Sequence, residues 1–138
     1  MAKSYESREA EVSAANTDTF LDRLGNEGAL GNVRVPAGVS RISEVWISAA
    51  PDTTFTVAIA AIIFIRLSGN GLPEGPETLV GMGIGQGGIT AVANTNRAFP
   101  PTVIPVSFRV TPGNQIRVGM EMTGDLGIVN GGVTLVFQ

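Results

Sequence analysis

The chain has 138 residues, the length of a single domain, with no cysteine, no histidine and a formal net charge of −3 at pH 7. The missing cysteines exclude disulfides and thiolate metal sites, and the missing histidines exclude the most frequent general base and metal ligand. Charged residues make up only 15% of the chain, and without clusters of Lys and Arg we expect no strong binding to nucleic acid.

Residues 1–32 are predicted to form a polar N-terminal arm in front of one domain over residues 33–138. Residues 1–34 carry ten of the 21 charges and show no strand-like alternation before Asn32. Within the arm, TDTFLDRLG (17–25) has the cap and apolar spacing of a short helix, and a partly ordered tail is the alternative. The first residues, MAKSYESREAEV, contain no apolar segment, so we expect no signal peptide and synthesis in the cytoplasm.

The first predicted strand of the domain is RISEVWIS (41–48), which follows a turn at VPAG (35–38). Strict alternation places Ile42, Glu44, Trp46 and Ser48 on one face and Ser43, Val45 and Ile47 on the other. Trp46 therefore shares its face with polar residues and is predicted to point outward. Burial at a subunit contact and stacking on a sugar both explain such a ring.

The next predicted strand, FTVAIAAIIFIRL (55–67), is apolar on both faces. The most apolar part of the chain, Phe55 to Ile65, has eleven residues, too short for a membrane-spanning helix, which needs about 20. One face of a sandwich strand normally meets solvent, so a second apolar face indicates a further covering. We assign Ile59, Ile63 and Ile65 to the core, and the following residues to a subunit contact: Ala60, Ile62 and Phe64.

A loop is predicted over SGNGLPEGPE (68–77), and a strand over TLVGMGIG (78–85), followed by a short strand in ITAVA (89–93). GMGIGQGG (81–88) contains the letters G-x-G-x-x-G. A dinucleotide site would require a following helix and an acid about 20 residues further on, and neither is visible. We instead predict a strand with one bare face that packs against another backbone or subunit, and assign Gly83 and Gly85 to the contact.

Two alternating segments, VIPVSFRV (103–110) and QIRVGMEM (115–122), flank TPGN (111–114), which has proline and glycine placed for a type II turn. Each has one apolar face, which we expect to point inward: Ile104, Val106, Phe108 and Val110 in the first, and Ile116, Val118, Met120 and Met122 in the second. A two-residue hairpin would set Phe108 beside Arg117, so either the loop contains a bulge or the two strands belong to different sheets. Arg109 and Arg117 are predicted to point outward. The last strand is VTLVFQ (133–138), after a turn at NGG (130–132).

Carboxylates are the remaining candidates for chemistry. Two of them could act as the acid and base of a glycosidase, or bind calcium together with loop carbonyls. Their spacing resembles no calcium loop, and solvated charges are the preferred interpretation. The carboxylates considered are these six: Glu44, Asp52, Glu74, Glu77, Glu121 and Asp125. We predict no catalytic, metal-binding or cofactor-binding residue among them, and we predict that the protein is not an enzyme.

The predicted fold is an all-β, antiparallel β-sandwich. Over about residues 33–138 the chain resembles the single jelly-roll coat and decoration proteins of viruses. The likeness lies in the polar arm, in the chain end within VTLVFQ, and in two longer stretches: VPAGVSRISEVWISAA (35–50) and VIPVSFRVTPGNQIRVGMEM (103–122). The resemblance implies a jelly-roll-like sandwich without catalysis that assembles through symmetric contacts and is located in the virion.

We expect a homo-oligomer, with a trimer favoured, because only eleven charges over residues 35–138 leave much apolar surface to cover. Genome-binding arms of coat proteins are basic, whereas residues 1–34 carry four basic and six acidic side chains. This difference favours contact of residues 1–32 with other coat proteins over nucleic-acid packaging. The alternative function is a carbohydrate-binding module that uses Trp46 and the loop at 68–77.

Overall fold

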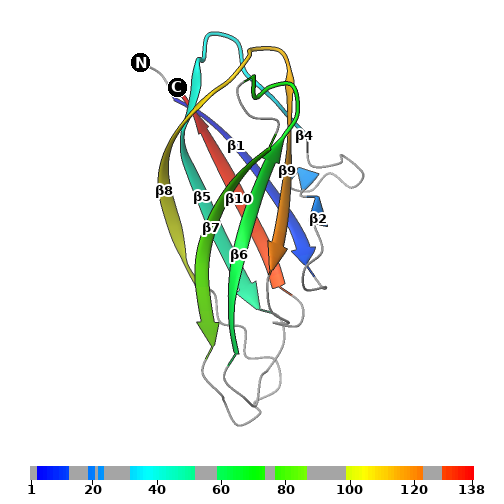
Figure 1. Ribbon diagram of the computed structural model, residues 1–138, viewed down its shortest axis with the longest axis vertical. Coiled ribbons are helices and arrows are strands. Elements are labelled where there is room, and N and C mark those ends of the chain that lie inside the picture. The colour runs from blue at the N-terminus through cyan, green and yellow to red at the C-terminus, as the bar shows by residue number, and fades with distance from the viewer. Residues whose placement is uncertain are drawn as a thin grey trace.

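The computed structural model describes residues 3–12, 19–20, 22–23, 32–51, 59–73, 77–86, 99–122 and 129–138. Every regular element in these ranges is a β-strand, and all strand pairs are antiparallel. Two sheets face each other across a common core (Figure 1). The predicted antiparallel β-sandwich is therefore confirmed. No helix in the described ranges is long and apolar enough to cross a membrane.

Each sheet combines strands from distant parts of the chain. The first, sheet A, has the order β3 (Asp22–Arg23), β1 (Ser4–Val12), β10 (Val129–Phe137), β5 (Arg41–Pro51), β8 (Phe99–Arg109). The second, sheet B, has the order β2 (Thr19–Phe20), β9 (Gln115–Met122), β6 (Ile59–Ser68), β7 (Glu77–Gln86), and β4 (Asn32–Arg34) also pairs with β9. Among the described strands, β8 and β7 therefore end the two sheets on one side of the sandwich (Figure 1).

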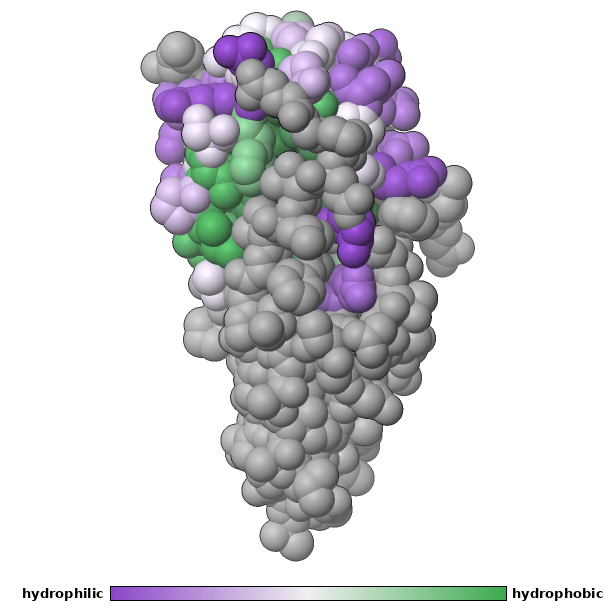
Figure 2. Space-filling model, in the orientation of Figure 1, coloured by the Kyte–Doolittle hydropathy of each residue, from purple (hydrophilic) through white to green (hydrophobic). Residues whose placement is uncertain are grey.

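The core lies between the sheets and is built from the alternating apolar positions of the strands. In β9, Ile116, Val118 and Met120 are fully buried, as their spacing predicts. From β8, the predicted inward face is only partly buried against this core, and consists of Ile104, Val106 and Phe108. Green, apolar atoms accordingly remain visible along the left-hand side of the molecule, where β8 runs (Figure 2).

The TPGN turn carries the chain from one sheet to the other. Gly113 has a φ of 84°, and the Asn114 amide donates to the Thr111 carbonyl oxygen at 3.2 Å. β8 before the turn belongs to sheet A and β9 after it belongs to sheet B. This placement resolves the register conflict between Phe108 and Arg117, because the two strands are not neighbours in one ladder. The prediction that the two strands belong to different sheets is therefore confirmed, and the alternative of a bulge in the loop is not needed.

Gly69, in the loop after β6, is expected to be among the least replaceable glycines. Its φ is 111°, and a Cβ there would lie 2.6 Å from the Gln115 carbonyl oxygen. Gly113 also has a positive φ, but a Cβ there would meet nothing within 4 Å. Gly69→Ala should therefore lower the free energy of unfolding by about 2–4 kcal/mol and Gly113→Ala by about 1 kcal/mol, as measured by urea unfolding. Equal losses would contradict the close approach at Gly69.

The N-terminal prediction needs correction. Residues Ser4–Val12 are not part of a separate arm, because they form β1 and pair with β10 along their whole length. The expected helix within 17–25 is also wrong for its described part, where Thr19–Phe20 and Asp22–Arg23 are strands. β1 escaped prediction because both of its faces are polar, so no apolar alternation marks it. Its backbone hydrogen bonds come from a strand at the other end of the chain.

Two further expectations fail at local irregularities. Ile42 was placed on the face of Trp46, but it is fully buried in the core with Val45 and Ile47. The register with β10 and β8 shifts between Ile42 and Glu44. The bulge at Ser43 therefore turns the Ile42 side chain to the core face of the sheet, opposite to the face of Trp46. The NGG turn is also wrong, since residues 130–132 lie within β10. A Cβ at Gly132 would lie 2.7 Å from Ser48 Oγ of the neighbouring strand, so a larger residue there would require the Ser48 side chain to turn away.

The glycine-rich segment lies in β7 from Gly81 to Gln86, which confirms the predicted strand there. Residues 87–88 and the expected strand at 89–93 lie outside the described residues.

Candidate interface on the outer face of sheet A

The outer face of sheet A carries two adjacent cross-strand rows that we call the Trp46 patch. The registers of β1, β10, β5 and β8 align the first row as Tyr5, Val136, Glu44, Pro105 and the second as Ser7, Thr134, Trp46, Val103. The neighbours of Trp46 along β5, Val45 and Ile47, are fully buried in the core. Because side chains alternate along a strand, Trp46 lies on the opposite, outer face, as predicted.

Exposed apolar area distinguishes this patch from the rest of the described surface. Tyr5 is 53% exposed and Val103 is 50% exposed. These two are the exposed large hydrophobic side chains among residues 3–9, 32–48, 65–73, 102–121 and 131–138. Trp46 is half-buried, and Pro105 is exposed. Val136, whose register neighbours are Tyr5 and Glu44, is fully buried although it lies outside the core cluster. The patch therefore consists of a buried apolar residue, Val136, surrounded by more exposed apolar and aromatic side chains.

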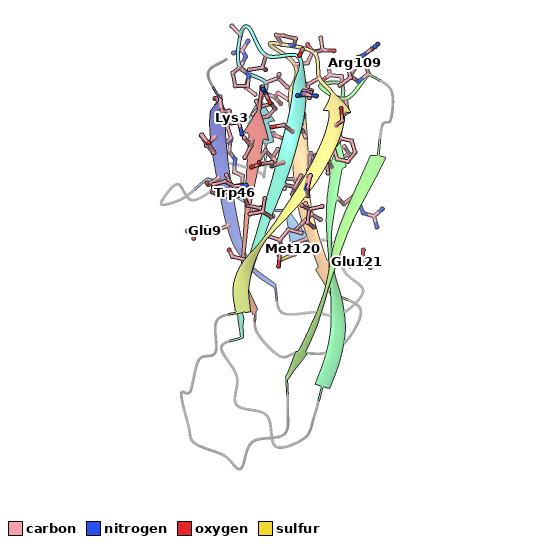
Figure 3. All side chains as sticks on the ribbon, turned by 90° about the vertical axis from the view of Figure 1, so that its left-hand side faces the viewer. Lys3, Glu9, Trp46, Arg109, Met120 and Glu121 are labelled. Atoms are coloured by element: carbon pink, nitrogen blue, oxygen red, sulfur yellow. The ribbon has the colours of Figure 1, made fainter. Side chains whose placement is uncertain are left out.

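Polar contacts within the patch hold the aromatic rings in place. The indole Nε1 of Trp46 donates to Glu44 Oε2 at 2.9 Å, and Lys3 Nζ lies 3.8 Å from Glu44 Oε1. The ring of Tyr5 meets that of Trp46 edge-on, with centroids 5.6 Å apart and an interplanar angle of 60°. Figure 3 shows Lys3 and Trp46 close together on the side of sheet A away from β6 and β7. The indole N–H is satisfied internally, so the ring is oriented before any partner arrives.

This arrangement suits binding better than catalysis. The Glu44 carboxylate already accepts from the indole and lies near the Lys3 ammonium. Tyr and Trp are the residue types enriched at the energetic centres of protein contacts, because they bury much apolar area at little cost in rotamer entropy. An exposed aromatic pair can also stack on a sugar ring.

The two other candidate carboxylates that the structure describes, Glu77 and Glu121, lie in sheet B and not beside Glu44 in sheet A. Glu121 lies in sheet B and pairs with Arg66 at 3.1 Å. Glu77 begins β7, and Asp52, Glu74 and Asp125 lie outside the described residues. Within the described ranges, no group of three or more His, Cys, Asp or Glu residues is placed to hold a metal ion.

The remaining predicted contact residues lie on sheet B. The register sets Ala60 opposite Gly85, Ile62 opposite Gly83, and Phe64 opposite Gly81. Directly opposite residues of an antiparallel pair share a face, so five of the six predicted contact residues belong to one face of the β6–β7 pair. Trp46 does not join them, because it lies on the other sheet. The six residues thus fall on two surfaces.

Two predicted outward arginines are exposed, Arg109 and Arg117. Arg109 is the register partner of Arg41, and together with Ser40 and Ser107 these residues line a surface pocket of about 580 Å³. Arg41 donates to Gln138 Oε1 at 3.4 Å.

Sequence reasoning missed Tyr5, Lys3 and Val103 as members of the patch. Tyr5 and Lys3 were set aside with the polar arm, and Val103 was not examined as an outward residue. One signal was available: Tyr5, the single tyrosine of the chain, is a large ring in an otherwise polar segment (residues 3–9). No protein-family model, curated protein or solved structure matches the chain.

Proposed function

We propose that the protein is a structural subunit that assembles with copies of itself, in the manner of a viral coat or decoration protein. The observation that carries this proposal is the Trp46 patch, in which exposed Tyr5 and Val103 flank an oriented indole ring. Covering such a surface in a subunit contact removes apolar area from water at little cost in side-chain ordering. The expected assembly is a trimer, located in the virion.

The order of the strands supports the comparison with jelly-roll coat proteins. Sheet A alternates early and late strands as β1, β10, β5 and β8, and sheet B does so as β4, β9, β6 and β7. Interleaving of this kind is typical of a jelly roll, in which the chain winds between two sheets. Tyr5 belongs to residues 1–32, so the N-terminal residues would take part in assembly as members of the Trp46 patch. Any contact of residues 1–32 with other coat proteins would then include Tyr5.

A carbohydrate-binding module is the second candidate. The observation in its favour is the aromatic pair beside a carboxylate, since sugars stack on rings and donate hydroxyl hydrogen bonds to carboxylates. Against it, Glu44 already holds the Trp46 indole and lies near Lys3. A sugar would have to compete with these contacts for the Glu44 carboxylate, whereas a subunit contact can leave them in place.

Trp46 is the only tryptophan, so its fluorescence reports on the patch alone. Light scattering at tens of micromolar should give a mass of about three times 14.3 kDa or more. Dilution to a monomer should shift the Trp46 emission to longer wavelength as water reaches the ring. Val103→Asp should prevent formation of the trimer at all concentrations, whereas Gln115→Asp, on the exposed part of β9, should not. A wild-type monomer at tens of micromolar would refute assembly. An emission change on adding oligosaccharides to that monomer would favour the carbohydrate module.

A further inference from the structure

The two long edge strands of the sandwich differ in how they are protected against pairing. β8 contains Pro100, Pro101 and Pro105, so three of its eleven residues have no N–H to donate. β7 has no proline, and its only charged residue is Glu77 at one end. β7 also pairs with β6 over ten residues without a register shift. Within the described residues, no strand pairs with β7 on its other side.

An unpaired sheet edge presents a row of N–H and C=O groups that fits one kind of partner, another extended strand. Natural proteins block long edges with proline, charge or bulges when no partner is intended. β8 has proline within the strand, and β7 has none of these features after Glu77. The contrast on one molecule indicates that β8 is protected from pairing and β7 is not.

We propose that the free edge of β7 pairs antiparallel with β7 of a second copy about a two-fold axis, so that sheet B continues across two subunits. The inference rests on the proposed self-assembly and names the contact. An antiparallel pair of identical strands is self-complementary, so one surface serves both subunits. The ten residues of β7 span about 30 Å, so the two Glu77 carboxylates would lie at opposite ends of the seam.

The pairing of two β7 strands also accounts for the composition of the sheet face formed by the alternating glycines of β7 and their partners in β6. Gly81, Gly83 and Gly85 take alternate positions in β7, opposite Phe64, Ile62 and Ala60 of β6. Across the two-fold axis these rows would become one continuous face, with glycine at its centre and apolar residues on both sides. The predicted contact residues of sheet B would then belong to the same interface.

This contact does not use the Trp46 patch, which lies on the outer face of sheet A. A trimer built through the patch and a two-fold contact through β7 can therefore exist together. In that case β7 pairing links trimers into a larger assembly, and without the patch contact it gives a dimer.

Residue-resolved hydrogen exchange of the wild-type protein tests the pairing directly. At a free edge, every second amide from Leu79 to Ile84 faces solvent and exchanges fast. In the proposed pair, all amides of this stretch are protected, and the formerly free ones should exchange at least about 100-fold more slowly in the assembled protein than in a dilute monomer. Alternating protection is still expected in β8.

Each outcome decides a different point. Alternating protection of β7 in an assembled sample overturns the β7 contact and leaves self-assembly standing. Alternating protection in a protein that stays monomeric overturns both. Full protection of β7 that persists in a dilute monomer means that the edge is covered within the chain, which also overturns the contact between copies.

Charge substitutions provide a second test. Gly81→Lys or Gly81→Glu places like charges near the two-fold axis, so each variant alone should lose the β7 contact, as seen in its mass by light scattering. An equimolar mixture of the two should recover it. The matched variants Ser107→Lys and Ser107→Glu, at an exposed position of β8, should keep the wild-type mass. A wild-type mass for both Gly81 variants would overturn the proposal.

Discussion

Ile47→Asp is expected to unfold the protein, whereas Trp46→Asp, one residue earlier in β5, is expected to leave it folded and to abolish assembly through the patch. Ile47 is 0% exposed in the core between the sheets. A carboxyl group there has no partner, and its burial costs several kcal/mol, a large part of the roughly 5–15 kcal/mol that stabilises a typical domain. Trp46 lies on the outer face, where a carboxylate meets water.

Circular dichroism and light scattering separate the two results. Ile47→Asp should lose the β-type spectrum, and Trp46→Asp should keep it while its mass falls below that of a trimer. Ser48→Asp, at an exposed position of the same strand, serves as a control for added charge near the patch. If Trp46→Asp also unfolds, the indole is part of the core; if it keeps the wild-type mass, the patch is not the contact.

Arg8→Met is expected to lower the free energy of unfolding by about 2–4 kcal/mol. Arg8 is 6% exposed, and its Nε and one terminal nitrogen donate to the Asn32 carbonyl oxygen at 3.1 and 2.8 Å. The other terminal nitrogen donates to the Ser7 carbonyl oxygen at 2.8 Å. Asn32 begins β4, so this side chain ties β1 of sheet A to a strand of sheet B. Methionine fills similar space but leaves these carbonyl groups without their donor.

Urea unfolding measures the loss, and energy transfer from Tyr5 to Trp46 shows where it occurs. These are the only tyrosine and tryptophan, and their rings are 5.6 Å apart across β1 and β5. In Arg8→Met, transfer should fall at lower urea than the β-type circular dichroism, because β1 separates first. Arg8→Lys keeps the charge but has a single nitrogen, so an intermediate loss is expected. Wild-type stability of Arg8→Met would show that β1 is held by its ladder with β10 alone.

The strongest sequence predictions concerned strands with one apolar face. Period-two alternation correctly identified the buried side of β9 and the partly buried side of β8, and proline and glycine correctly marked the turn at TPGN. Both signals are local, because side-chain direction alternates within a single strand and turn geometry depends on four consecutive residues. Trp46 was placed on the outer face for the same reason.

Predictions failed where a partner distant in the chain decides the structure. A local pattern cannot show that polar β1 pairs with β10, that Ser43 forms a bulge against β10, or that residues 130–132 continue a strand between β1 and β5. In each case hydrogen bonds and packing across the sheet overrode the local preference of the residues.

The sequence by itself determined that this protein is an antiparallel β-sandwich, because alternation, turn chemistry and the lack of charge are properties of short stretches. The tertiary structure decided which strands became neighbours, and with them the candidate surfaces. Tyr5 contacts Trp46 only because β10 lies between their strands, and β7 is an edge only because of the order of sheet B. Pairing is a relation between distant segments, so neither surface is visible in any one of them.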